Sequence, residues 1–484
     1  MQPSHPTLPL AALLLSAAFL ASCVSSEHAP ARYVISEHGA VGDGTTVNTK
    51  AIQGAIDACA AAGGGVIVVP KGVFVSGALF FKQGVNLEVD KDAVLKSTTS
   101  MADFPPVYTS WEGIERYWTS AFLNFVGMKD VVVSGEGTID GSGLGFPGQG
   151  PGARRPGGRP PAGARRPPPQ PSPVPATLPR PEDVYPSPLP SVDALNLAAD
   201  PAHLPPINAA GIYLPGGAGR LSPPRAVVFQ NCTNVRVSGL HLKNQAKWGF
   251  VFIYCSNVAA ENLTVAIDSY IPSSDGMDVC SSSDVRISHC DIMCTDDDIS
   301  IKAGKDADGL RVNRPSENIT ISDCTFGSGG GVAMGSEVSG SIRHVLVQGC
   351  KFTGSSTVAR IKSQPSRGGV VEDIVYRDIQ VENVSRAIEL DLQWRMVPPL
   401  APRARELTVL RNVKIINLTG TAQSVGLIRG FKEAPIKDIG FEHCQVTAQH
   451  GLAVANAPDL DTSGLELKVA QGAPIIHENE TAQP

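Results

Sequence analysis

The chain lacks three features that would define common classes of protein. After residue 20, no apolar run is long enough to cross a bilayer as a helix, so no transmembrane segment is predicted. There is no basic excess: 40 Lys and Arg against 46 Asp and Glu give a net charge of −6, which argues against a general nucleic-acid binder. No Cys-x-x-Cys pair with histidines at zinc-site spacing is present. The net charge does not exclude an acidic substrate, because local Arg and Lys side chains decide such binding.

The N-terminus resembles a bacterial lipoprotein signal. A short apolar run covers residues 8–20 and ends in Leu-Ala-Ser-Cys, which is similar to a lipobox. We therefore expect residues 1–22 to be a signal peptide and Cys23 to carry a lipid, the protein's only link to a membrane. This predicts a periplasmic, outer-membrane or cell-surface lipoprotein of a bacterium. Because residues 1–9 contain no Lys or Arg, an ordinary secretory signal is the alternative, and it also predicts export.

A loose repeat runs along the chain from about residue 226. Most units have a polar turn with Asn, Asp or Ser followed by a short β-branched alternation, as in VVFQNCTNVRVSGLHL and VFIYCSNVAAENLTV. Cys232 and Cys255 occupy the same place in these two successive units, and no helical period separates the units, which is typical of a solenoid of short strands. We therefore predict an all-β fold, a single-stranded right-handed parallel β-helix. A sandwich or barrel is the alternative.

The chain divides into segments of different composition. Residues 31–146 are predicted to form the first coils with an N-terminal capping helix over 46–59, capped by Thr46 or Asn48. Residues 147–203 are interpreted as an insertion, since 147–190 contain 16 prolines and six arginines. Such a stretch favours a solvated polyproline-like segment over a basic flap that contacts an anionic polymer. Residues 204–470 are expected to hold the catalytic coils, and 471–484 a C-terminal tail.

The ten cysteines indicate core positions rather than a disulfide framework. Besides Cys23, several lie close to short β-branched runs, where a small apolar side chain packs well; they are Cys232, Cys255, Cys290, Cys324, Cys350 and Cys444. Disulfides between Cys255 and Cys280, or between Cys290 and Cys294, remain open.

Three consecutive carboxylates, Asp296, Asp297 and Asp298, are the strongest functional signal. They lie in IMCTDDDISIK, and charges this close should raise at least one pKa. A protonated carboxyl beside an ionised one is the pair that glycoside hydrolysis requires. Asp298 is expected to point away from Asp297 as a solvated or turn residue, because strand neighbours alternate.

Other polar residues recur at intervals of about one coil around this triplet. The intervals run from Asp275 to Asp296, from Asp297 to Gly330, and from Gly330 to Lys362. Equivalent positions on neighbouring coils lie about 4.8 Å apart, so these residues should form a column. Arg360 and Lys362 are two apart on a predicted strand and should point the same way. The column could cleave a sugar chain at one end and hold a uronate at the other.

These motifs resemble glycoside hydrolase family 28, the polygalacturonase-like pectinases. The resemblance runs from HGAVGDGTTVNT to about residue 450. The family's Asn-Thr-Asp is kept only at Asp275, its Gly-Asp-Asp corresponds to residues 295–297, and its Arg-Ile-Lys is complete at 360–362. Its Gly-His-Gly corresponds to residues 329–331, where Gly330 replaces the histidine. A family tyrosine falls near Trp394 by spacing.

The resemblance implies inverting hydrolysis of a pectic polysaccharide with neither metal nor cofactor. Asp296 would be the general acid, and Asp275 and Asp297 would position and deprotonate the attacking water. Arg360 and Lys362 would bind the substrate carboxylate. Two further residues are predicted to contact the substrate. Trp394 either stacks on a sugar ring or is part of the buried packing, and Lys302 either lines the cleft or lies at the surface.

Two departures bear on the substrate. Gly330 removes a histidine that would support the acid, and Ser273 removes an Asn from the same rim. Rhamnogalacturonan or another branched pectin is therefore a candidate substrate beside plain polygalacturonate. A histidine introduced at position 330 is expected to preserve activity. Glu337 is interpreted as structural.

Two other functions compete with this interpretation. A calcium-dependent pectate-type lyase would use oxygens of the Asp296–Asp298 cluster as ligands. A non-catalytic glycan-binding β-helix is the third hypothesis, and Gly330 is its best support. Internal cleavage and cleavage from chain ends both remain open. We expect a monomer.

Overall fold

The computed structural model describes residues 30–146, 222–394 and 404–478. Predictions for residues 1–22, Cys23 and the insertion 147–203 fall outside the described residues. The fold is that of the unit that begins at Ala31.

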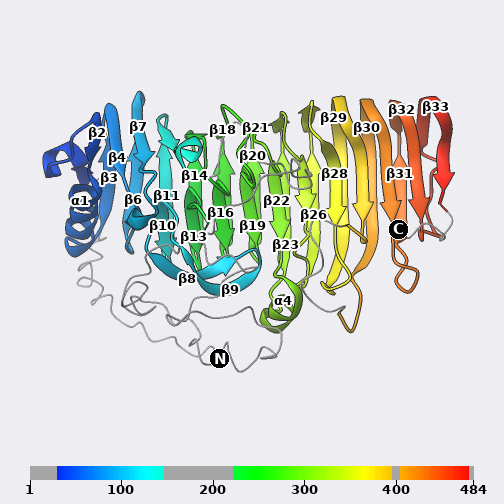
Figure 1. The fold of residues 1–484 in the computed structure, drawn as a ribbon, viewed down its shortest axis with the longest axis horizontal. Helices are drawn as coiled ribbons and strands as arrows, with labels where there is room; N and C mark the ends of the chain where they lie inside the picture. Colours follow the sequence, from blue (N-terminus) through cyan, green and yellow to red (C-terminus); the bar gives the residue numbers. More distant parts are fainter. Residues whose placement is uncertain (1–29, 147–221, 395–403, 479–484) are drawn as a thin grey trace, which may run out of the picture. The chain divides into compact units, whose positions relative to one another are not determined.

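The strands stack in three parallel columns, and in the middle coils each strand pairs with the third one after it (Figure 1). The first column contains β1 (Arg32–Val34), β3 (Gly65–Val69), β6 (Val85–Val89), β11 (Lys129–Gly135), β14 (Thr233–Ser238), β17 (Ser256–Glu261), β20 (Ser283–Ser288), β23 (Ser316–Ser322) and β26 (Ile342–Gln348). The second contains β2 (Asp43–Val47), β4 (Gly72–Ser76), β7 (Ala93–Ser97), β12 (Thr138–Asp140), β15 (His241–Lys243), β18 (Thr264–Ala266), β21 (Asp291–Met293), β24 (Thr325–Phe326) and β27 (Lys351–Thr353). This topology confirms the predicted right-handed parallel β-helix.

The third column carries the candidate site and is called the site sheet. Its members are β5 (Leu79–Phe80), β10 (Leu123–Val126), β13 (Val227–Gln230), β16 (Phe250–Ile253), β19 (Met277–Cys280), β22 (Ile299–Lys302), β25 (Val332–Met334) and β28 (Thr357–Lys362). The last coils merge their strands into long ones: β29 (Val370–Asp391), β30 (Val409–Arg429), β31 (Lys437–Glu442), β32 (Cys444–Ala455) and β33 (Leu465–His477). Strand β33 therefore continues past residue 470, where a tail was expected to begin.

A helix lies at the first coil, as predicted. Helix α1 (Thr49–Ala61) begins after Asn48 and buries Ile52, Ile56 and Cys59. The side chain of Asn48 makes no cap bond to the helix. It accepts a hydrogen bond from the Val41 amide at 2.7 Å instead, which ties the helix to the preceding loop. A short helix, α4 (Asp306–Val312), follows β22.

Ladders of identical side chains fill the interior. Phe125, Phe229 and Phe252 stack behind the site sheet at centroid distances of 4.9 and 5.3 Å. The cysteines from Cys59 onward are free thiols, and all except Cys280 are buried, which confirms the predicted core role and leaves none of these thiols in a disulfide. Aromatic stacking of this kind contributes about 0.5–1.5 kcal/mol a pair beyond burial.

Asparagine forms the bends between the columns, also as predicted. Asn234 and Asn257 occupy equivalent positions at the start of β14 and β17, directly after the bend, with φ of 58° and 53°. Nδ2 of Asn257 donates to Oδ1 of Asn234 at 2.7 Å, so the turn side chains form a ladder of their own. Asn tolerates this left-handed backbone better than most residues.

One antiparallel hairpin interrupts the solenoid. Strands β8 (Pro106–Trp111) and β9 (Ile114–Thr119) pair with each other and lie beside the site sheet (Figure 1). None of the helices in the described ranges 30–146, 222–394 and 404–478 is long and apolar enough to cross a membrane.

Candidate active site

The site is built from residues that project from, or lie just before, successive strands of the site sheet. In β22, Ile299 and Ile301 enter the core, so Ser300 and Lys302 face outward. Strand pairing sets Ser300 beside Asp278 on one side and Ala333 on the other, and sets Arg360 beside Ala333. Neighbouring strands lie about 4.8 Å apart, so residues distant in sequence meet here.

The three consecutive aspartates form a bend just before β22, and backbone hydrogen bonds hold this bend to both neighbouring coils. The Gly276 amide donates to the carbonyl of Asp297 at 3.0 Å, and the Gly330 amide donates to the carbonyl of Asp296 at 2.7 Å. Asp275 and Gly330 therefore flank the bend on the two sides, which confirms the column predicted from the spacing.

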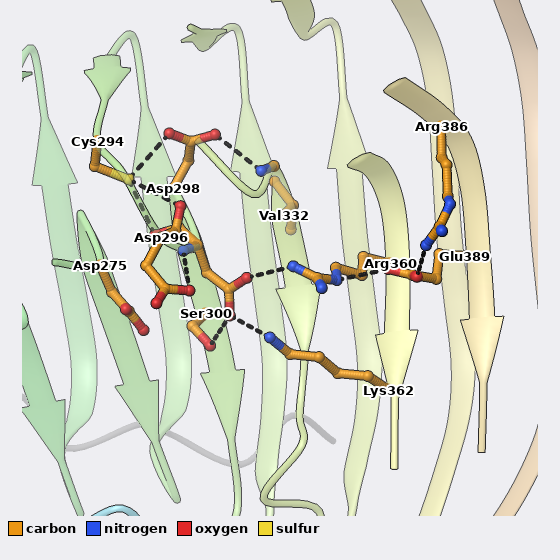
Figure 2. Close-up of polar contacts among 12 residues, drawn as sticks. Asp275, Cys294, Asp296, Asp298, Ser300, Val332, Arg360, Lys362, Arg386 and Glu389 are labelled. Atoms are coloured by element: carbon orange, nitrogen blue, oxygen red, sulfur yellow. Dashed lines mark hydrogen bonds and ion pairs between the residues drawn. The ribbon is translucent and has the colours of Figure 1, made fainter. Parts of the chain in front are cut away.

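Asp297 is clamped by the two predicted cations (Figure 2). Its Oδ1 lies 2.9 Å from Nη1 of Arg360, and its Oδ2 lies 2.7 Å from Nζ of Lys362. Burial alone would raise the pKa of Asp297, but the charges of Lys362, Arg360 and Lys302 outweigh it and hold the pKa below its ordinary value. Asp297 is thus an ionised carboxylate.

Asp296, unlike Asp297, has no cationic partner within the described part of the chain, and its pKa is raised. Its Oδ1 accepts a hydrogen bond from the Asp297 amide at 3.1 Å, and no Lys or Arg among the described residues forms an ion pair with it (Figure 2). Burial, then the charges of Asp275 and Asp297, raise the pKa of Asp296 to about 7. A protonated and an ionised carboxyl therefore stand side by side, as the triplet predicted.

Asp275 belongs to a separate buried cluster centred on Lys302. Nζ of Lys302 lies 2.8 Å from Oδ2 of Asp275, also contacts Asp278, and stands 4.0 Å from the ring centroid of Trp248. Burial raises the pKa of Asp275, and the Lys302 charge opposes that shift; burial likewise raises the pKa of Asp278 to about 6. Lys302 is only 4 % exposed, and its ammonium binds buried carboxylates. It is therefore not a surface residue.

Asp298 points away from Asp297 and lies in a bend, as expected, but the expectation that it is solvated was wrong. It is fully buried, its Oδ2 accepts from the Gly331 amide at 2.9 Å, and its Oδ1 lies 3.2 Å from Sγ of Cys294. Burial is the main cause that raises its pKa to about 8. Solvation was wrongly expected because residues 295–298 form a bend that turns the Asp298 carboxyl toward the Gly331 amide of the next coil.

Trp394 and Glu389 complete the cationic side. Nζ of Lys362 lies 5.0 Å from the ring centroid of Trp394, so the structure brings this predicted residue to the site. Nε of Arg360 lies 2.8 Å from Oε2 of Glu389, which also pairs with Arg386 (Figure 2). Arg360 therefore bridges Asp297 and Glu389 with the two sides of its guanidinium.

Gly330 fills the space between Asp297 and Arg360. A Cβ atom at this position would lie 2.7 Å from Oδ1 of Asp297 and 3.1 Å from Nη1 of Arg360. Any side chain would have to displace the clamp. This geometry argues against the expectation that a histidine at position 330 preserves activity.

A pocket of about 370 Å³ adjoins the cationic side, and Arg360, Arg386, Glu389, Ser424 and His450 are among its lining residues. Sequence reasoning missed Asp278, Trp248, Glu389 and Arg386. Met277 and Val279 on either side of Asp278 were a signal that could have placed Asp278 outward, but the other three residues had no motif. Glu337 is buried, in agreement with a structural role.

The part of the chain that the structure describes contains no group of three or more His, Cys, Asp or Glu side chains arranged to hold a metal ion. Asp296, Asp297 and Asp298 point in different directions and have separate partners (Figure 2). The three adjacent carboxylates therefore do not form a calcium cage of 6–8 oxygens.

Comparison with known proteins identifies relatives over most of this region. The model of the family described as Glycosyl hydrolases family 28 matches residues 217–462. A probable polygalacturonase of Vitis vinifera is 24% identical over 365 residues, covering 72% of this chain and 61% of that protein. An exo-poly-alpha-D-galacturonosidase of Dickeya chrysanthemi is 27% identical over 415 residues, covering 81% of this chain and 63% of that protein.

Solved structures agree with the sequence matches. The crystal structure of a hyperthermoactive exopolygalacturonase from Thermotoga maritima is 25% identical, with a TM-score of 0.69 over 90% of this chain and 94% of that one. The chain spans about three fifths of the length of the two curated relatives.

Proposed function

Because the chain belongs to glycosyl hydrolases family 28, we propose that it hydrolyses galacturonic-acid-containing pectic polysaccharide with inversion at the anomeric carbon. The observation that carries the proposal is the contrast between two adjacent carboxyls. Asp296 has a pKa of about 7 and no cation partner within the described ranges, while Asp297 is held ionised by Arg360 and Lys362. Inverting glycosidases need one carboxyl of each kind.

Asp296 is the general acid in this mechanism. At neutral pH a large fraction of it carries the proton that the leaving glycosidic oxygen must receive. Once that proton has left, Asp296 is an anion beside Asp297 and Asp275, and their charges favour its reprotonation for the next turnover. General acid catalysis of this kind contributes about 10²–10⁴-fold in rate.

Asp297 and Asp275 position the attacking water. Asp297 is ionised and fixed by two cations, so its oxygens are rigid acceptors. Asp275 is fixed by Lys302, which assigns Lys302 to positioning Asp275 rather than to binding substrate. The water loses its proton to this pair as it adds to the anomeric carbon.

Arg360, Lys362 and Trp394 form the proposed uronate-binding side. The cations are partly neutralised by Asp297 and Glu389, but a substrate carboxylate can share them as an additional charge-assisted acceptor. The indole of Trp394 beside Lys362 offers an apolar face to a sugar ring. Polygalacturonate fits this chemistry, and so does the galacturonate unit of rhamnogalacturonan.

Export and lipid attachment at Cys23 are part of the proposal and rest on the N-terminal sequence. Metabolic labelling with a fatty acid tests them. Label in the native chain that is lost in Cys23→Ser is the expected result, and secretion without label would point to an ordinary signal.

Product analysis tests the activity. The purified protein is incubated with polygalacturonate and with rhamnogalacturonan backbone, each in the presence of EDTA. Saturated products with new reducing ends are expected. Unsaturated products that require calcium would identify a lyase, and binding without products would identify a glycan-binding protein.

A further inference from the structure

The catalytic column continues toward the N-terminus in a register that backbone hydrogen bonds define. The Gly276 amide donates to the Asp297 carbonyl, the Gly249 amide to the Asp275 carbonyl, and the Ala226 amide to the Trp248 carbonyl. Trp248 therefore occupies the position of Asp275 one coil earlier, and the next coil back places Arg225 there. A polymer that contacts both Asp275 and Arg360 runs along this column, and the coils of Trp248 and Arg225 lie on its N-terminal extension.

The outward side chains of the site sheet change character at the same point. Strand pairing aligns Val228, Val251, Asp278, Ser300, Ala333 and Arg360 in one outward row. A second row contains Ile253, Cys280 and Lys302. Beside the catalytic coils the rows change from the apolar Val251 and Ile253 on β16 to Asp278 on β19 and to Ser300 and Lys302 on β22. The second row also contains Gln230 on β13, which is buried and accepts a hydrogen bond from Thr109 of the hairpin at 2.7 Å. The apolar part is unsuited to an acidic sugar chain.

The β8–β9 hairpin covers this apolar part. Trp111 stacks on Trp118 and on Trp248 at centroid distances of 5.4 and 4.9 Å, and the three rings pack with Val251 and Ile253. The three tryptophans are between 3 and 5 % exposed. The aromatic plug, defined here as Trp111, Trp118 and Trp248, therefore closes the outer face of the sheet from solvent.

Residues at and beside its tip hold the hairpin to two different coils. Arg225 donates to the carbonyl of Ser110 at 2.9 Å. Near the tip, the Lys305 amide donates to the Gly113 carbonyl at 3.0 Å, and Nη2 of Arg311 lies 2.7 Å from Glu115. These contacts extend the hairpin from β13 to the loop after β22, so it is part of the rigid frame.

The C-terminal side of the catalytic column is cationic and accessible, in contrast to the apolar N-terminal side. Beyond β28 the column meets the pocket that contains Arg360, Arg386 and His450, and the side chain of Arg386 is 49 % exposed. Cationic and solvent-accessible groups there suit the continuation of a polyanionic chain.

We propose that the aromatic plug makes the active site blind on the N-terminal side, so that this protein removes single sugar units from chain ends. The proposal rests on the proposed hydrolysis of galacturonan and specifies its mode. Asp297, Asp275 and Trp248 occupy the same position on three successive coils, so Trp248 lies two coil spacings, about 9.6 Å, from Asp297. The coil of Asp275 between them covers about the length of one hexose ring, so one sugar is accommodated between the reacting bond and the plug.

The mode of action is read from the native protein on long polygalacturonate. We expect monogalacturonate from the earliest time points, and viscosity that falls only slowly as reducing ends accumulate. A mixture of oligomers with a rapid loss of viscosity would overturn the inference while leaving the hydrolase function intact. No hydrolysis of any galacturonan would overturn the proposed function and the inference with it.

Two variants test whether the hairpin is the cause. The Ser120 amide donates to the Pro105 carbonyl at 3.2 Å, so residues 106–119 can be replaced by two glycines without moving their ends. The double substitution Trp111→Ala and Trp118→Ala hollows the plug and keeps the backbone, in case the deletion does not fold. Folded protein of either kind should release dimers and longer products at early times.

Glu112→Gln is the matched control, because it changes a charge at the tip of the hairpin, where Glu112 lies 3.5 Å from Lys305, and leaves the tryptophans in place. Its products should be those of the native chain. If a folded plug variant still released only monogalacturonate, the assignment of the blind end to the plug would be overturned.

Discussion

Gly330 and Asp297 are packed so closely that a Cβ atom on Gly330 would lie 2.7 Å from Oδ1 of Asp297 and 3.0 Å from its Cα. The absence of a side chain is what lets Arg360 reach Asp297. The glycine is therefore part of the charge clamp, rather than a sign that the catalytic machinery has been lost.

Gly330→Ala should lower kcat/KM by about tenfold or more, because relieving the overlap must shift the Asp297–Arg360 pair; overpacking typically costs about 1–3 kcal/mol. Steady-state kinetics on polygalacturonate measure this. Gly440→Ala is the matched control, since a Cβ there meets no atom within 4 Å and should leave kcat/KM unchanged. Full activity of Gly330→Ala would show that the clamp is not required.

Asp296→Asn should reduce kcat by about 10²–10⁴-fold, since the amide cannot give up a proton to the leaving oxygen. Asp298→Asn is a suitable comparison, because Asp298 has a pKa of about 8 and is replaced by a neutral group of the same shape. The kcat of Asp298→Asn should remain within about tenfold of the native kcat. Equal losses in the two variants would contradict the assignment of the acid to Asp296.

The pH profile of kcat/KM should fall on the alkaline side with an apparent pKa of about 7. Asp296 must carry its proton to act, and burial with the charges of Asp275 and Asp297 places its pKa there. Lys362→Met removes a positive charge near both carboxyls, which should move the alkaline limb to higher pH. A limb that does not move, or an alkaline plateau in the native protein, would argue against this acid.

Stability should decline as pH rises toward 8 through Asp298. Its folded pKa of about 8 lies above the unfolded value of about 3.9, so its contribution is complete below about pH 4 and is lost as pH rises through 8. Across this window the slope from this one group is about 1.4 kcal/mol per pH unit. Denaturant unfolding at several pH values gives the free energy of unfolding of the native chain and of Asp298→Asn. The difference between the two free energies should change with pH by that slope. A difference that does not change with pH would contradict a buried, neutral Asp298 carboxyl.

Lys302→Met should both destabilise the protein and impair catalysis. It leaves Asp275 and Asp278 buried without their cation, which typically costs about 3–5 kcal/mol. The pKa of Asp275 should then rise, so the acid limb of the pH profile should move to higher pH. Arg343→Ala on β26 breaks a partly exposed pair with Glu317 on β23, and it should cost about 0–1 kcal/mol and leave the pH profile unchanged. If Lys302→Met lowers stability but leaves the pH profile unchanged, Lys302 stabilises the fold and does not tune Asp275.

The sequence could predict those features that depend on one repeated coil. Asn234 and Asn257 mark equivalent positions because the same turn-and-strand pattern recurs on each coil, although the coils differ in length, and a spacing of about one coil placed Asp275 beside the Asp296–Asp298 bend. Arg360 and Lys362 were placed on one face by strand alternation alone. Local rules suffice wherever neighbours in space are one coil apart.

The remaining features depend on register and on contacts between distant segments. The burial of Asp298 follows from a bend that is hydrogen-bonded to Gly331 on the next coil, and the partners of Lys302 depend on which residue of β19 it opposes. The contact between Glu115 and Arg311 joins two coils that are far apart in the sequence, through an antiparallel hairpin that breaks the repeat. No local pattern contains that information.

The central claim is that Asp296 and Asp297 act as an acid and base pair on galacturonan without a metal. The most direct measurement is product analysis after incubation of the native protein and Asp296→Asn with polygalacturonate in EDTA. The account predicts saturated products with new reducing ends from the native protein and almost none from the variant. Unsaturated products that appear only with calcium, or equal activity in the two proteins, would contradict it.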